Sequence, residues 1–225
     1  LFFSMTKTFS GLAIGIAWDL GLLHMDDPII GFFPEECPGT PDENLSRITV
    51  QHLLTMSCGI HENTYSDLFV QDNWVKAFLK QSFPHEPGTF YRYSTHCSHM
   101  LSAIITKVSG LSLEQFLNRY LFYPMEIYEA QWELSPEKLT AGGMGLSLYP
   151  MSLVKIAQLL LKEGSYNGSQ LISKEYLKMA VTQQIIKQDD INNPDSEFSG
   201  NGYGYQFHIG KDGYYRMDGA FGQLC

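Results

Sequence analysis

The stretch Ser4-Met5-Thr6-Lys7 opens a long, nearly uncharged segment that continues from Thr8 to Leu23 and favours a helix. Residues three apart on a helix lie on one face, so the Ser4 hydroxyl and the Lys7 amine become neighbours. Apolar surroundings disfavour an ammonium ion, so the lysine can stay neutral and accept the hydroxyl proton. The positive end of the helix dipole also favours the alkoxide. The stretch therefore predicts a nucleophile beside its base.

The Ser-x-x-Lys spacing by itself is a weak signal, because it occurs twice more in the chain. Ser135 and Lys138 enclose a proline in a loop-like stretch. Ser152 begins a predicted helix, where it fits an N-cap with Lys155 as a solvated side chain. The first pair differs because small or apolar residues cover several faces of its predicted helix, about 4–22: Met5, Phe9, Gly11, Leu12, Gly15, Ile16 and Leu20. A purely structural role for the pair stays open at this point.

The composition indicates one packed domain. The chain has 225 residues, of which 44% are hydrophobic and 13% aromatic. A net charge of −9 argues against nucleic acid or an anionic membrane surface as a partner. No apolar run reaches the roughly 20 residues that a membrane helix needs. No sequence pattern predicts a cofactor, and the oligomeric state is left open.

The cysteines and the chain ends bear on the compartment. Four widely spaced cysteines, Cys37, Cys58, Cys97 and Cys225, show no metal-ligand or redox spacing and weakly favour the cytoplasm. The chain begins without methionine in an apolar stretch and stops where a strand begins, so we expect a fragment of a longer protein. A signal peptide would lie upstream, and the localisation is therefore left open.

Periodicity predicts helices first and strands late. Helical spacing and caps predict helices at about 50–56, 67–81, 97–108, 113–122, 152–162 and 173–182. Residues 188–201 are polar and predict a mobile loop. Alternation over 203–209, a turn at 210–213 and a return over 214–217 predict a hairpin. We therefore expect an α+β fold in one domain, 1–225, with a helical region at about 4–185 and a sheet-forming hairpin at about 203–225.

Two later segments could complete a site built on a lysine-activated serine. Tyr93-Ser94-Thr95 follows Pro87-Gly88-Thr89 and supplies a tyrosine just before a predicted helix. The run 218–222, Asp-Gly-Ala-Phe-Gly, is a glycine-interrupted strand where backbone can approach a ligand. Such a strand could hold a substrate and donate N–H groups to an oxyanion.

The chain resembles the serine β-lactamase and penicillin-binding protein superfamily in the order of four features. These features are the Ser4–Lys7 pair, the Tyr93 segment, the Gly142-Gly143 pair and the Gly219 strand. Leu-Leu-Thr-Met-Ser-Cys-Gly-Ile at 53–60 is also similar to a segment of that superfamily. Within it the chain resembles class C-related serine hydrolases, which include esterases and D,D-peptidases. The resemblance implies a β-lactamase/transpeptidase-like fold, with an antiparallel sheet flanked by a helical cluster and truncated at both ends.

By position, the resemblance implies that Ser4 is acylated, that Lys7 takes its proton and that Tyr93 passes the proton to the leaving group. It places the oxyanion between the N–H groups of Ser4 and Ala220, beside Gly219. The substrate would be a small ester, amide or peptide-like molecule, hydrolysed through an acyl-enzyme. The alternative is a catalytically weak or inactive module that binds or senses a similar ligand.

The candidate substrate contacts are Thr95, Asp218 and Phe221. Thr95 stands where the superfamily usually has asparagine, and Met217-Asp218-Gly219 stands where a lysine or histidine precedes Thr-Gly. The missing cation argues against substrates that carry a carboxylate. It favours a neutral ester or amide, or a positive group that Asp218 could meet.

Structural interpretations of the same residues stay open. Asp218 could instead pair with Arg216, and a lone tyrosine such as Tyr93 is more often a core residue. His96 and His99 are three apart, as metal ligands on a helix can be, but no third ligand stands at a telling spacing. The sequence therefore predicts no metal site.

Overall fold

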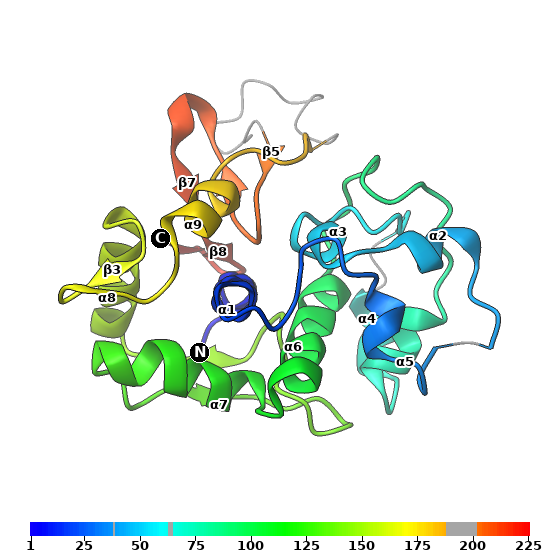
Figure 1. Ribbon diagram of the computed structural model, residues 1–225, viewed down its shortest axis with the longest axis horizontal. Helices are drawn as coiled ribbons and strands as arrows, with labels where there is room; N and C mark the ends of the chain where they lie inside the picture. The colour runs from blue at the N-terminus through cyan, green and yellow to red at the C-terminus, as the bar shows by residue number, and fades with distance from the viewer. Residues whose placement is uncertain (38, 63–64, 188–201) are drawn as a thin grey trace.

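A computed structural model of the protein describes residues 1–37, 39–62, 65–187 and 202–225. The predicted loop 188–201 lies outside the described residues. Helix α1, Thr6–Asp19, runs through the middle of the molecule (Figure 1). Helices α3 and α6 lie on one side of α1, while α9 and the late strands lie on the other (Figure 1). The described residues combine helices with small antiparallel sheets, as expected for an α+β fold.

The remaining helices of the described residues are mostly short. The α-helices are α2 Glu43–Arg47, α3 Val50–Leu54, α4 Tyr65–Phe69, α5 Trp74–Leu79, α6 Thr95–Ser109, α7 Leu113–Leu117, α8 Pro150–Leu161 and α9 Lys174–Ala180. A π-helical turn η2, Asn118–Phe122, continues α7, and 3-10 turns lie at η1 Ile29–Phe32, η3 Tyr123–Met125 and η4 Lys211–Gly213.

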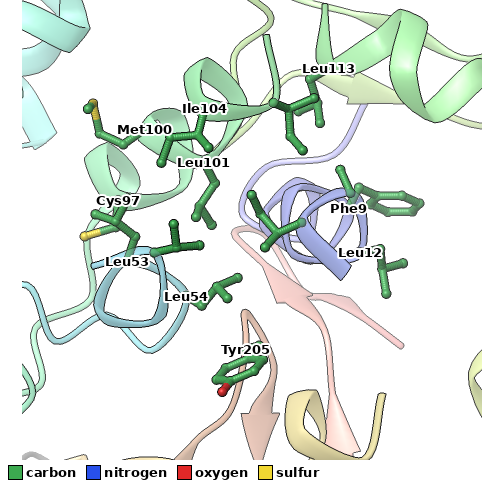
Figure 2. Close-up of a cluster of buried hydrophobic side chains, with 14 of the residues drawn as sticks. Phe9, Leu12, Leu53, Leu54, Cys97, Met100, Leu101, Ile104, Leu113 and Tyr205 are labelled. Atoms are coloured by element: carbon green, nitrogen blue, oxygen red, sulfur yellow. The ribbon is translucent and has the colours of Figure 1, made fainter. Parts of the chain in front are cut away.

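Helix α1 is enclosed by the rest of the fold. Every residue from Thr6 to Ala17 is buried, and the helix packs on α6, α7 and α9. Glycines permit this approach: a Cβ on Gly15 would lie 2.4 Å from the ring of Tyr176. The main hydrophobic cluster surrounds α1, α3 and α6, as Figure 2 shows around Phe9 and Leu12. Burial on all sides matches the nearly uncharged sequence of this helix.

The helix predicted over 67–81 is wrong as one element, because the chain breaks it into α4 and α5. Residues 70–73 leave the helical path, and the side chain of Asn73 then caps α5 by accepting from the N–H of Lys76 at 2.8 Å. Glu137 Oε1 accepts a second orphan donor, the N–H of Trp74, at 2.9 Å. Asparagine competes with helical hydrogen bonding and so restarts the helix here.

The interpretation of Ser152 and Lys155 is also wrong. Helix α8 begins at Pro150 with Tyr149 as its N-cap residue, so Ser152 lies inside the helix. Ser152 is buried, and its hydroxyl donates to the carboxylate of Glu129. Lys155 Nζ donates to two backbone carbonyls, those of Met125 at 2.9 Å and Glu126 at 3.0 Å. Proline is favoured at the first position of a helix, so α8 begins at Pro150, before the N-cap predicted at Ser152.

The predicted strand 203–209 is wrong, because it folds back on itself. It forms β5, Gly202–Tyr203, and β6, His208–Ile209, which pair antiparallel through a turn at Gln206 with φ +64°. The predicted return strand is present as β7, Tyr215–Arg216, paired with β6. The other strand pairs are β1 Gln131–Trp132 with β2 Leu146–Ser147, β3 Ser165–Tyr166 with β4 Ser169–Gln170, and β8 Asp218–Gly219 with β9 Gln223–Leu224.

Gln206 connects several elements at that turn. Its side-chain amide donates to the carbonyls of Leu53 and Leu54 on α3 and accepts from the hydroxyl of Ser98 on α6 at 2.6 Å. Its backbone carbonyl accepts from the Thr8 hydroxyl of α1 at 2.9 Å. This buried turn therefore fixes α1, α3 and α6 relative to one another. Among the described residues, no helix is both long and apolar enough to cross a membrane.

Candidate active site

The structure brings Ser4 and Lys7 together at the first turn of α1. Lys7 Nζ lies 3.0 Å from Ser4 Oγ and donates to the backbone carbonyl of Gly143 at 2.8 Å. The Lys7 side chain is 2% exposed. The Ser4–Lys7 distance lies within the range for direct proton transfer.

Burial sets the protonation of this lysine. Desolvation lowers the pKa of Lys7 from 10.5 to about 7, while the negative charge of Asp218 and the Cys97 thiol oppose that change. Removing the ammonium from water is costly and few opposite charges compensate. Near neutral pH, a large share of the molecules therefore carries a neutral amine next to the serine hydroxyl.

Tyr93 lies against the same pair. It stands in the extended segment just before α6, and Lys7 Nζ lies 5.0 Å from the centroid of its ring. Burial raises the pKa of Tyr93, the hydrogen bond with Ser4 lowers it, and Asp218 raises it further. Tyr93 therefore keeps its phenolic proton at neutral pH and is not a resident phenolate.

Strand β8 approaches the N–H groups at the start of α1. A Cβ on Gly219 would lie 3.2 Å from the backbone nitrogen of Ser4 and 3.1 Å from that of Met5. A side chain here would therefore crowd the helix start. Ala220 and Phe221 follow in an exposed turn, where Phe221 has φ +63° and contacts the ring of Phe3. The predicted oxyanion residues Ser4 and Ala220 thus lie on adjoining segments.

The segment before Ser4 is held from two directions. On one side, Phe2 exchanges backbone hydrogen bonds with Gly145 at 3.0 Å and Leu146 at 2.6 Å. On the other side, Gln223 of β9 accepts from the N–H of Phe3 and donates to the carbonyl of Leu1, both at 2.8 Å. These contacts fix the backbone on which the Ser4 hydroxyl is carried.

Asp218 is engaged by two side chains, those of His208 and Arg216. Its carboxylate oxygens lie 3.1 Å from His208 Nε2 and 3.0 Å from Arg216 Nε. Burial acts to raise the pKa of Asp218, but His208 and Arg216 outweigh it and the pKa falls. The pairing with Arg216, considered from the sequence, is therefore present. The sequence reasoning missed His208, whose ring also packs against that of Tyr93 in a tilted arrangement with centroids 5.8 Å apart.

Thr95 lies behind the lysine rather than at the surface. It is 4% exposed, and a Cβ on Gly143 would lie 2.5 Å from its methyl carbon. Thr95 thus packs against the residue whose carbonyl holds Lys7. Its predicted role as a substrate contact stays a prediction, as does that of Phe221.

Comparison with protein families places this site in context. The family model described as Beta-lactamase matches residues 1–225. The chain belongs to the beta-lactamase family. Among curated relatives, a beta-lactamase of Escherichia coli is 29% identical over 132 residues, covering 55% of this chain and 32% of the relative. A penicillin-binding protein 4* of Bacillus subtilis is 26% identical, covering 60% and 32% respectively.

Solved structures share the fold of this beta-lactamase family chain. A putative 6-aminohexanoate-dimer hydrolase from Bacillus anthracis superposes with a TM-score of 0.83 at 18% identity, covering 99% of this chain and 62% of that one. An octameric penicillin-binding protein homologue from Pyrococcus abyssi gives 0.71 at 23% identity, covering 99% and 54%. The matches to the first three curated relatives span between 31% and 58% of their length.

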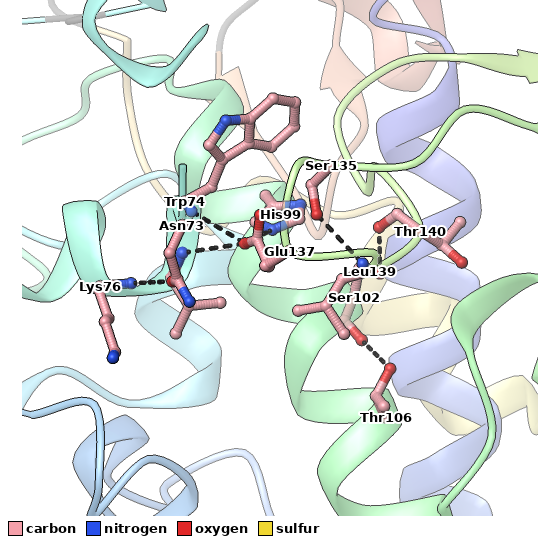
Figure 3. Close-up of polar contacts among 11 residues, drawn as sticks. Asn73, Trp74, Lys76, His99, Ser102, Thr106, Ser135, Glu137, Leu139 and Thr140 are labelled. Carbon is pink, nitrogen blue, oxygen red and sulfur yellow. Dashed lines mark hydrogen bonds and ion pairs between the residues drawn. The ribbon is translucent and has the colours of Figure 1, made fainter. Parts of the chain in front are cut away.

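Of the two histidines of α6, His99 belongs to a separate polar cluster of this family member, and His96 packs beside it on the same helix. His99 Nε2 lies 3.2 Å from Glu137 Oε1, the atom that also accepts the N–H of Trp74 (Figure 3). His96 packs against Phe78 with ring centroids 6.5 Å apart. In the part of the chain that the structure describes, no group of three or more His, Cys, Asp or Glu residues could hold a metal ion.

Proposed function

We propose that this beta-lactamase family chain carries the acylation site of a serine hydrolase. Lys7 takes the proton from Ser4 as Oγ attacks the substrate carbonyl. The N–H groups of Ser4 and Ala220 receive the oxyanion. Tyr93 passes a proton to the leaving group as the tetrahedral intermediate collapses. Water then attacks the acyl-enzyme, and Ser4 Oγ regains its proton.

One observation carries the proposal: Lys7 is buried, has a pKa of about 7, and lies 3.0 Å from Ser4 Oγ. A lysine with its ordinary pKa would be protonated at neutral pH and could not act as a base. The perturbed pKa and the short distance support the same role.

The charges beside Ser4 favour a neutral ester or amide as substrate. Met217 is buried and brings no charge, and Asp218 adds a negative charge on the strand next to the serine. Both oxygens of Asp218 already have partners in His208 and Arg216, so a cationic substrate group would have to compete with them. An uncharged acyl group is not repelled by the Asp218 carboxylate and does not have to compete with His208 and Arg216 for it.

A fluorophosphonate probe, which phosphonylates activated serines, tests the proposal. We expect the wild-type chain to be labelled once, Ser4→Ala to lose labelling and Lys7→Met to label at least a hundredfold more slowly, since general-base catalysis contributes about 10²–10⁴-fold. Labelling should rise with pH through about 7, as Lys7 loses its proton. Ser152→Ala and Lys155→Met form the matched control, because they alter another Ser-x-x-Lys pair. Unchanged labelling of Ser4→Ala contradicts the assignment.

A second experiment distinguishes a hydrolase from a binding module. Met217 and Thr95 favour the binding module, because both residues depart from the usual motifs. Nitrophenyl acetate should release more than one equivalent of nitrophenol per chain if the acyl-enzyme turns over. A burst of one equivalent without further release would indicate a module that is acylated but does not hydrolyse its ligand.

A further inference from the structure

The backbone carbonyls of Thr140 to Met144 form an unusual series, in which each accepts a hydrogen bond from a side chain. We name this segment, residues 140–144, the carbonyl ladder. From first to last, the donors are Ser102 Oγ at 2.6 Å, Trp132 Nε1 at 2.7 Å, Ser10 Oγ at 2.6 Å, Lys7 Nζ at 2.8 Å and again Trp132 Nε1 at 3.1 Å. Figure 3 includes the end formed by Ser102 and Thr140.

The carbonyl ladder is wedged between α1 and α6. A Cβ on Gly142 would lie 2.2 Å from the carbonyl oxygen of Ser98, and one on Gly143 would lie 2.5 Å from the methyl carbon of Thr95. Side chains are therefore excluded at the two glycine positions, and the backbone there has no side chain of its own to hold its orientation. The side-chain donors supply that orientation.

Trp132 has a special place among these donors, because it holds both sides of the glycine pair. It lies on β1, where it pairs with Leu146 of β2, so its ring is at the base of the loop that carries the ladder. Its single N–H is shared between the carbonyls of Ala141 and Met144. The carbonyl of Gly143, which accepts from Lys7, lies between those two anchor points.

We propose that Trp132 is a positioning residue for Lys7, acting through the carbonyl ladder, with Ser10 as a second positioning residue. The inference rests on the proposed role of Lys7 as the base. Without the indole N–H, the carbonyls of Ala141 and Met144 turn toward other donors, and the glycine backbone between them follows. The Gly143 carbonyl then no longer holds Lys7 Nζ against Ser4 Oγ.

The direction of the effect follows from the charges around Lys7. A carbonyl oxygen stabilises an ammonium ion more than an amine, so its withdrawal lowers the pKa of Lys7 further. The other groups that act on this lysine are Asp218 from β8, Tyr93 before α6 and Cys97 on α6. Replacing Trp132 by phenylalanine changes none of these three residues, so any shift arises from the loss of the carbonyl and from the movement of Lys7 that follows it.

Trp132→Phe is the test, because it keeps a ring and removes the N–H. We expect acylation by the fluorophosphonate probe to slow by roughly 10- to 100-fold, since misplacing a reacting group by about 1 Å can cost 10²-fold. For ester turnover, kcat should fall while KM changes less than twofold. The pH midpoint of acylation should move down by roughly half a unit or more. The matched control is Trp18→Phe, an indole that packs on Tyr176.

Direct titration of the Lys7 side chain by NMR, with ¹³C-labelled lysine, gives a readout that needs no catalysis. Its midpoint should fall in Trp132→Phe and in Ser10→Ala. If the fluorophosphonate probe does not label the wild-type protein, the proposed function is refuted, but the NMR titration still tests the positioning role of Trp132. A folded Trp132→Phe with an unchanged titration and an unchanged rate overturns the inference. Loss of the fold in both variants also overturns it, because it assigns the donors to stability alone.

Discussion

Replacing Lys7 by methionine should stabilise the folded chain, and by an amount that depends on pH. Burial lowers the pKa of this lysine from 10.5 to about 7. One unit of pKa corresponds to about 1.36 kcal/mol, so the protonated lysine destabilises the fold by roughly 5 kcal/mol at low pH. Methionine has a similar length and no charge, and it removes that cost.

The sign follows from proton binding. Between the folded pKa of about 7 and the unfolded value of 10.5, the unfolded chain binds more protons at this site. The stability of the wild-type chain therefore rises with pH in this window, at up to about 1.36 kcal/mol per pH unit from Lys7. Below the window the cost is complete, and above it the cost has gone. The variant lacks this slope.

Urea unfolding of both proteins at pH 7 and pH 9 measures the difference. The two lost hydrogen bonds, to Ser4 and Gly143, affect both pH values alike and cost about 1 kcal/mol each. The advantage of Lys7→Met over wild type should shrink by roughly 2 kcal/mol from pH 7 to pH 9. The same replacement at the exposed Lys80 is the control. A difference that does not change with pH would refute a neutral, desolvated Lys7.

Three further replacements test other parts of the reasoning. Asp218→Asn removes a charge that raises the pKa of Lys7, so the pH midpoint of probe labelling should move down; an upward shift contradicts this. Gly142→Ala places a Cβ 2.2 Å from the carbonyl of Ser98 and should cost about 1–3 kcal/mol in urea unfolding. Gln206→Ala should cost roughly 3 kcal/mol in the same assay, because it leaves buried partners unpaired; a loss below 1 kcal/mol would show that the turn does not fix the helices.

The sequence predicted those features in which local pattern and global packing agree. Helix α1 is nearly uncharged and is buried from Thr6 to Ala17, and the motif order predicted the fold. The prediction of one strand over 203–209 is wrong because the alternation of residues there reflects only the local sequence. Gln206 adopts a left-handed conformation to reach α1, α3 and α6, and that tertiary demand reverses the chain in mid-strand.

Within the candidate site, the sequence could predict contacts only between residues that are close together in the chain. The Ser4–Lys7 pair is set by helical spacing, whereas the contact with the Gly143 carbonyl spans 136 residues and has no periodic signal. His208 pairs with Arg216, two residues before Asp218, whereas the predicted turn at 210–213 would pair it with Tyr215, so the sequence did not place it beside Asp218. Trp132 gave no local signal at all, because its role depends on where the loop 133–145 folds back.

The burial of α1 from Thr6 to Ala17 has a consequence for the reactivity proposed for Ser4. A helix of 14 residues without a polar face has little stability alone in water, so it forms only when its neighbours are in place. Reactivity at Ser4 should therefore disappear as soon as any element that packs on α1 unfolds. A serine probe on this chain should then measure the fraction of fully folded molecules, and partly unfolded forms with a working serine should be absent.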